Sequence, residues 1–137
     1  MKLRLRLSLP SEERSVPLVR KVMRHALDVM GVAPGCVDDI ELALSEACTN
    51  VLDHAGAHDH YEVVAGVDGA FCVVEIFDAG GGFVPPAPAD QGVLIDPNAE
   101  QGRGLQLMRA LVDKLDFRVC TERGAVVRLQ KSLVYAR

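Results

Sequence analysis

The stretch EACTNVLDH, residues 46–54, decides the fold and carries the most informative polar residues of the chain. Glu46, Asn50 and His54 stand four residues apart, just over one helical turn, so their side chains rise along one face of a helix. Apolar residues of the same run form a stripe about 80° wide: Val37, Ile40, Leu44, Ala47 and Val51. The polar residues flank that stripe at the edge of the core. Because burying them unpaired is costly, they are hydrogen-bonded, metal-bound or functional.

Length and charge narrow the possible classes of protein. The chain has 137 residues, which predicts a single domain over residues 1–137. A net charge of −4 argues against direct binding to nucleic acid, because phosphate contacts need a basic surface. No apolar run approaches the roughly 18 residues of a membrane span, and the first six residues alternate charge with leucine, unlike a signal peptide. We therefore expect a cytoplasmic protein that does not bind membranes. Four cysteines without a C-x-x-C pair are expected to be reduced core residues: Cys36, Cys48, Cys72 and Cys120.

A strand and two helices are expected in the first half of the chain. Residues 3–9 alternate leucine with Arg or Ser, which predicts a half-buried strand. A helix is expected from Ser15, as its N-cap, to a stop at Gly31. Its basic side chains are Arg14, Arg20, Lys21, Arg24 and His25. This basic face is either simply solvated or a docking face for a partner. The second helix starts near Pro34 and runs through residues 46–54.

Strands dominate the second half. Asp68-Gly69 is a strong signal for a two-residue hairpin turn. Residues 84–101 are rich in Pro, Ala, Gly and Asp and show no clear element, which is typical of a functional lid. Gly102-Arg103-Gly104 opens a third helix. Strands are expected over residues 61–67, 70–77, 116–121 and 125–133, with a turn at 122–124. The order predicts an α+β two-layer sandwich, with helices on one face of a mixed, largely antiparallel sheet.

The helical triplet suggests a metal-dependent reaction. The amide oxygen of Asn50 suits a hard cation such as Mg²⁺, which takes few protein ligands and completes its shell with water and phosphate. Glu46 can orient or deprotonate a nucleophile beside such a metal. His54 can contact phosphate or bond to the backbone. The alternative is that all three are polar packing at the edge of a helix.

Two glycine-rich motifs follow. In Asp78-x-Gly80-x-Gly82 the glycines let backbone approach a ligand, and the carboxylate can accept a hydrogen bond from adenine N6. The alternative is a flexible turn after a strand. Gly102-Arg103-Gly104-Leu105 leaves free N–H groups at a helix start, which favours an anion. It is neither a Walker A loop nor a dinucleotide fingerprint, since G-x-G-x-x-G fails at Leu107.

Together the three motifs form a complete nucleotide site, and in this order they resemble the Bergerat ATP-binding fold of histidine-kinase catalytic domains, gyrase B and MutL. The matching residues are Glu46, Asn50 and His54 in the N box, Asp78, Gly80, Gly82 and Phe83 in the G1 box, and Gly102, Gly104 and Leu105 in the G2 box, with Arg103 between those glycines. The resemblance covers nearly the whole chain. It implies ATP and Mg²⁺ as cofactors and makes residues 84–101 the ATP lid.

The length and the pattern E-A-x-T-N-x-x-x-H narrow the resemblance to anti-sigma factor serine kinases of the RsbW/SpoIIAB type. This resemblance implies phosphorylation of a Ser or Thr on an anti-sigma factor antagonist (a STAS protein), sequestration of a sigma factor, and a possible homodimer. It implies Glu46 as catalytic base, Asn50 as Mg²⁺ ligand and Asp78 as adenine reader. Arg20 falls where the family places a partner-contacting arginine.

One departure keeps two functions open. Family kinases often carry a basic residue just before the G2 glycines, whereas this chain has Glu100-Gln101 there, with Arg103 as the nearest arginine. The first function is an ATP-dependent protein serine kinase that is also an anti-sigma factor, and the Glu46 side chain favours it. The alternative, favoured by Glu100, is a nucleotide-gated regulatory binding module with little or no kinase activity.

Overall fold

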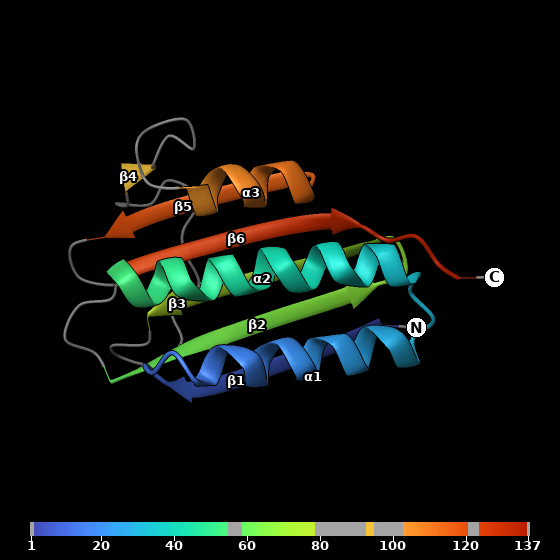
Figure 1. The fold of residues 1–137 in the computed structure, drawn as a ribbon, viewed down its shortest axis with the longest axis horizontal. Helices are drawn as coiled ribbons and strands as arrows, with labels where there is room; N and C mark the ends of the chain where they lie inside the picture. The colour runs from blue at the N-terminus through green and yellow to red at the C-terminus, as the bar shows by residue number, and fades with distance from the viewer. Residues whose placement is uncertain (1, 55–58, 79–92, 95–102, 121–123, 137) are drawn as a thin grey trace.

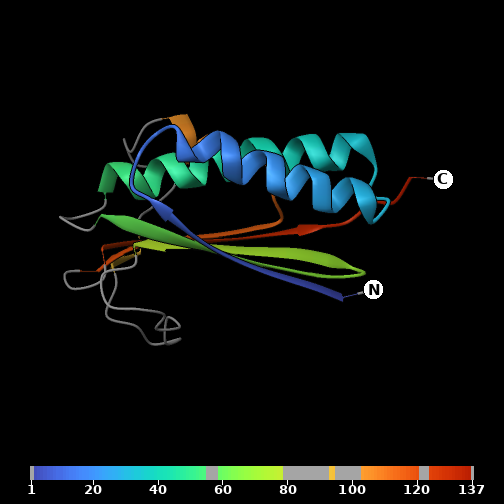
Figure 2. The same ribbon diagram turned by 90° about the horizontal axis from the view of Figure 1, so that it is seen from below.

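The helices and strands of the chain form two layers in a computed structural model that describes residues 2–54, 59–78, 93–94, 103–120 and 124–136 (Figure 1). In chain order the elements are β1 (Lys2–Pro10), α1 (Ser15–Val29), α2 (Pro34–His54), β2 (His60–Asp68), β3 (Phe71–Asp78), β4 (Val93–Leu94), α3 (Arg103–Leu111), β5 (Lys114–Cys120) and β6 (Gly124–Ser132). The helices cover one face of the sheet (Figure 2). The predicted α+β two-layer sandwich is therefore confirmed.

The sheet has six strands in the order β1-β2-β3-β6-β5-β4. Each neighbouring pair is antiparallel. The last strand, β6, lies between β3 and β5, so the middle of the sheet joins segments that are far apart in the sequence. No helix in the described part of the chain is long and apolar enough to cross a membrane.

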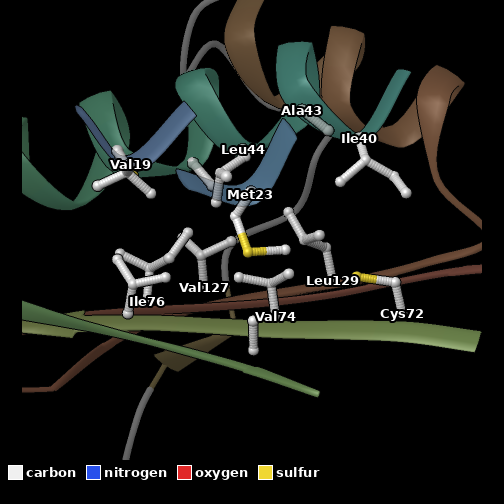
Figure 3. Packing of buried hydrophobic residues seen from close by; sticks show 14 of the residues in the cluster. Val19, Met23, Ile40, Ala43, Leu44, Cys72, Val74, Ile76, Val127 and Leu129 are labelled. Atoms are coloured by element: carbon white, nitrogen blue, oxygen red, sulfur yellow. The ribbon is translucent and has the colours of Figure 1, made fainter. Parts of the chain in front are cut away.

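The core lies between the helices and the sheet, as the apolar patterns predict. Side chains of α1 and α2 meet side chains of β3 and β6 in Figure 3, where Val19, Met23 and Leu44 lie over Val74 and Val127. The predicted stripe of α2 is fully buried, at 0% exposure: Val37, Ile40, Leu44, Ala47 and Val51. On β1 the leucines point inward and the residues between them are exposed. The side-chain periods of 3.6 and 2 thus placed the core correctly.

Two local predictions are wrong in detail. Ser15 is not the N-cap of α1: the cap residue is Arg14, which makes no capping hydrogen bond with its side chain. Ser15 is instead buried in the first turn, where its hydroxyl donates to the Glu12 carbonyl at 2.6 Å. The β2–β3 turn is centred on Gly69-Ala70, one residue later than expected, because Val67 pairs with Cys72. Gly69 adopts a φ of +82° there, which only glycine takes readily.

A short strand lies in the segment where no element was expected. Val93 and Leu94 form β4 and pair with Val119 and Arg118 at the edge of the sheet. Two residues carry too little pattern to be recognised from sequence alone. The rest of the predicted lid, residues 84–92 and 95–101, lies outside the described residues, as do Glu122 and Arg123 of the predicted last turn.

Candidate nucleotide-binding site

The elements that carry the three predicted motifs meet at one end of the molecule. The C-terminal end of α2, the end of β3 and the start of α3 lie at the same end of the two layers in both Figures 1 and 2. Asp78 is the last residue of β3 and Arg103 the first of α3, while Asn50 lies near the C-terminal end of α2. Topology therefore gathers residues that are up to about 50 positions apart in the sequence.

Asn50 lies on the side of α2 that faces away from α1. Glu41, which contacts α1 through Arg24 at 2.6 Å, precedes Asn50 by nine residues, or about half a turn around the helix. Asp39, on nearly the same face as Asn50, lies 3.4 Å from Lys131 of β6. Asn50 is 8% exposed. Since α2 lies between α1 and α3 (Figure 1), this amide lies at the edge of the core on the α3 side.

Asp78 is buried on the face of the sheet that the helices cover. It has the same strand parity as Cys72, Val74 and Ile76, which are all fully buried, and is itself 4% exposed. Its neighbour on β2 is Tyr61, whereas pairing with β6 ends one residue earlier. Burying a carboxylate is costly unless it is hydrogen-bonded or meets a ligand. Asp78, on the sheet, thus faces the helix layer at the end of the molecule that also carries Asn50.

A buried chain of hydrogen bonds holds the strand beside Asp78. The Tyr61 hydroxyl lies 2.6 Å from Ser15 Oγ, and the Cys48 thiol lies beside it. Since the Ser15 hydroxyl donates to the Glu12 carbonyl, Tyr61 donates to Ser15. Burial raises the pKa of Tyr61 to about 12 and that of Cys48 to about 12, so both groups stay protonated. This network joins β2, α1 and α2 next to the predicted site.

The remaining predicted residues are described only in part. Glu46 is partly buried, one turn before Asn50. The helix predicted to open at Gly102-Arg103-Gly104 is α3, and Arg103, Gly104 and Leu105 are its first residues. Side chains of His54, Arg103 and Leu105 are not described, and other predicted positions lie outside the described residues: Gly80, Gly82, Phe83, Glu100, Gln101 and Gly102. Their roles stay predictions.

The donor set fits a nucleotide-bound metal better than a site built from protein ligands alone. No group of three or more His, Cys, Asp or Glu side chains within the described ranges can hold a metal ion. Mg²⁺ often binds through one or two protein oxygens and takes its other ligands from phosphate and water. A single buried amide at Asn50 matches that pattern.

Two surface features between α1 and α2 did not emerge from the sequence. A hollow of about 470 Å³ lies between the start of α1 and the end of α2 and is lined by Ser11, Glu13, Val16, Thr49, Leu52 and Asp53. An ion-pair cluster joins Arg24 to Glu41 and Asp38. The basic residues of the first predicted helix and the acidic residues early in the second could have predicted ion pairs between these helices. Another hollow, of about 360 Å³, includes Lys2, Asp68 and Phe71 on the face of the sheet without helices, away from Asn50 and Asp78.

Comparison with known proteins identifies the family. The model of the histidine kinase-like ATPase domain matches residues 9–131, and the chain therefore belongs to that family. Proteins named serine-protein kinase RsbW from Bacillus cereus (strain AH820), Bacillus anthracis (strain A0248) and Bacillus thuringiensis (strain Al Hakam) are each 27% identical over 136 residues. The matches cover 93% of this chain and 84% of each relative. The resemblance to RsbW-type anti-sigma serine kinases is thus confirmed.

A solved structure agrees with the fold. The crystal structure of the RsbU and RsbW domains of Rv1364c from Mycobacterium tuberculosis matches with a TM-score of 0.71 and 21% sequence identity. The match covers 98% of this chain and 34% of that longer chain. At this identity the likeness concerns the fold alone.

Proposed function

We propose that this protein is an ATP-dependent protein serine kinase and anti-sigma factor that phosphorylates a STAS-type anti-sigma factor antagonist and sequesters a sigma factor. The observation that carries the proposal is the burial of Asn50, on the helix layer, and of Asp78, on the sheet, at the same end of a histidine kinase-like ATPase fold. The name serine-protein kinase, borne by relatives that match 93% of the chain, supports this activity.

In this proposal each polar residue has a separate task. Asn50 would hold Mg²⁺ through its amide oxygen, and Asp78 would accept a hydrogen bond from the adenine amino group. Bound Mg·ATP supplies the phosphoryl group. Glu46 would take the proton of the attacking serine hydroxyl, one turn from the metal ligand. His54, Gly80, Gly82, Phe83, Gly102, Arg103, Gly104 and Leu105 complete the proposed nucleotide contacts.

Residues 84–101 are proposed as the ATP lid of a single domain. Arg20 of α1 is proposed as a partner contact, and it is partly exposed, at 41% of its side chain. A homodimer remains part of the proposal through family resemblance. We propose no direct contact with nucleic acid, in keeping with the net charge of −4.

A transfer assay tests the proposal. The protein is incubated with γ-labelled ATP, Mg²⁺ and the STAS protein encoded in the same genome, with a STAS variant that lacks its acceptor serine as the control. We expect label on the wild-type STAS protein and none on the variant. ATP binding without any transfer would refute the kinase activity.

Glu100-Gln101 supports a second candidate, a nucleotide-gated binding module with little or no transfer. An acidic side chain just before the G2 glycines would repel the γ-phosphate, where family kinases often place a positive charge. This candidate predicts that ATP changes the affinity for the sigma factor while the STAS protein remains unlabelled. A Glu100→Lys substitution would then raise transfer, whereas an active kinase would change little.

A further inference from the structure

Arg20 and Arg24 share one carboxylate unequally. Arg24 Nη1 donates to Glu41 Oε2 at 2.6 Å and to Asp38 Oδ1 at 2.9 Å. Arg20 Nε lies 3.9 Å from Glu41 Oε1, which is too far for a hydrogen bond. Arg20 makes no hydrogen bond to any residue within the described ranges. One arginine is therefore firmly held, while the other is attracted to the same carboxylate at a distance.

The firm contact belongs to Arg24 because two acidic groups converge on it. Its hydrogen bonds to Glu41 and then to Asp38 raise the pKa of Arg24, so its guanidinium stays charged. That charge partly neutralises Glu41 and weakens the pull of Glu41 on Arg20. Arg20 keeps 41% of its side chain exposed, with N–H donors free to meet another carboxylate.

The surface around Arg20 suits an acidic protein partner. From Ser15 to Leu27, α1 contains no acidic residue, and Lys21 and His25 are exposed beside Arg20. Leu18, 55% exposed, adds an apolar contact. The start of α1 borders the end of α2, as the hollow between them shows. The exposed basic and apolar side chains of this part of α1 complement an acidic partner, and under the proposed function that partner is the kinase substrate, the antagonist.

We propose that Glu41 competes with the antagonist protein for Arg20, and that Arg24 is a positioning residue that limits this competition by occupying Glu41. The inference rests on the proposed function, in which Arg20 contacts the STAS antagonist. On binding, Arg20 leaves Glu41 for a carboxylate of the antagonist. The negative charge of Glu41 stays partly compensated, because Arg24 remains bound to it.

This arrangement predicts that substitutions of Glu41 and of Arg24, the two partners of one ion pair, change antagonist binding in opposite directions. Glu41→Gln removes the competitor, so Arg20 becomes more accessible and the antagonist binds more tightly. Arg24→Gln leaves Glu41 to Arg20 alone, so Arg20 becomes less accessible and the antagonist binds more weakly. A purely structural pair that pins α1 to α2 would instead shift binding in the same direction in both variants.

Two measurements on the full chain test the inference. The rate at which phenylglyoxal modifies Arg20, followed by mass spectrometry of its peptide, reports accessibility without a partner. Calorimetric titration with the STAS protein of the same genome reports affinity. We expect both to rise about two- to fivefold in Glu41→Gln and to fall about two- to fivefold in Arg24→Gln, the range for an exposed ion pair. Asp38→Asn is the control, since Asp38 contacts Arg24 and leaves Glu41 in place; Arg20 should react as in wild type.

The outcomes separate this inference from the function beneath it. Opposite shifts in both measurements support it, while shifts of the same sign, or no change in Arg20 reactivity, overturn it. The reactivity of Arg20 could shift as expected while only the affinity for the sigma factor, titrated in the same way, shifts with it. Arg20 would then bind the sigma factor and not the antagonist, and the inference fails. A wild-type protein that does not bind the STAS protein at all refutes the proposed function itself.

Discussion

Replacing Tyr61 with phenylalanine tests whether the buried hydrogen-bond chain stabilises the protein next to the site. Tyr61 is 0% exposed, and its hydroxyl lies 2.6 Å from Ser15 Oγ. The substitution removes the donor to Ser15 and the hydroxyl's contact with the Cys48 thiol, but it keeps the ring and its packing. A neutral buried hydrogen bond contributes about 1 kcal/mol net, and the thiol contact less. We expect the free energy of unfolding to fall by about 1–2 kcal/mol.

Urea unfolding followed by circular dichroism measures this loss. With an m-value of about 2 kcal/mol/M, the midpoint should fall by about 0.5–1 M. Tyr135→Phe is a matched control, because Tyr135 is 39% exposed near the end of the described chain. That control should stay within about 0.5 kcal/mol of wild type.

A double-mutant cycle with Ser15→Ala decides whether the two hydroxyls act on each other. Ser15→Ala also loses its bond to the Glu12 carbonyl, so it should cost about 1–2 kcal/mol alone. The double variant should lose about 1 kcal/mol less than the sum, since the Tyr61–Ser15 bond is lost only once. The reasoning would be refuted if the losses in unfolding free energy of the two single variants added to that of the double variant within about 0.3 kcal/mol. A Tyr61→Phe variant as stable as wild type would refute it too.

Three further predictions concern pH and nucleotide. Burial raises the pKa of Cys72 to about 12. The stability that the neutral thiol contributes is therefore complete below about pH 9 and is lost as the pH rises toward 12. Between pH 7 and pH 10 wild type should lose on the order of 1 kcal/mol that Cys72→Ala does not lose, and equal urea-midpoint shifts in both proteins would contradict this. Asn50→Ala should weaken Mg·ATP binding about tenfold or more in calorimetry, and an unchanged affinity would remove Asn50 from the metal site. Asp78→Asn should impair ATP more than GTP, while equal losses would mean that Asp78 does not read the base.

Local patterns predicted the elements of this protein because short-range physics specifies them. Alternation on β1 and the apolar stripe of α2 follow directly from the side-chain periods of strand and helix. A buried Asn50 at the edge of the core was also predictable, since its position relative to the stripe fixes which side of α2 it occupies. Of the two glycine motifs, the structure describes Asp78 and the backbone of Arg103, Gly104 and Leu105, so the contacts of the other residues stay predictions.

Long-range contacts account for what the sequence did not predict. Serine is a favoured N-cap residue, yet the Ser15 hydroxyl instead accepts a hydrogen bond from Tyr61, which lies 46 residues away in the chain. The division of Glu41 between Arg20 and Arg24 likewise depends on how α1 packs against α2. Such contacts arise only after the elements assemble, so no periodicity reveals them.

The position of β6 has a consequence for synthesis on the ribosome. β1, β2 and β3 are made before β6 and pair with one another, but the other side of β3 pairs with β6, as in the pairing of Phe71 with Ser132. A growing chain therefore carries β3 as an exposed edge, able to pair with a neighbouring nascent chain, until residues 124–132 have left the ribosome. Shielding that edge with a chaperone, or keeping translating ribosomes farther apart on the messenger RNA, is thus expected to raise the yield of folded protein.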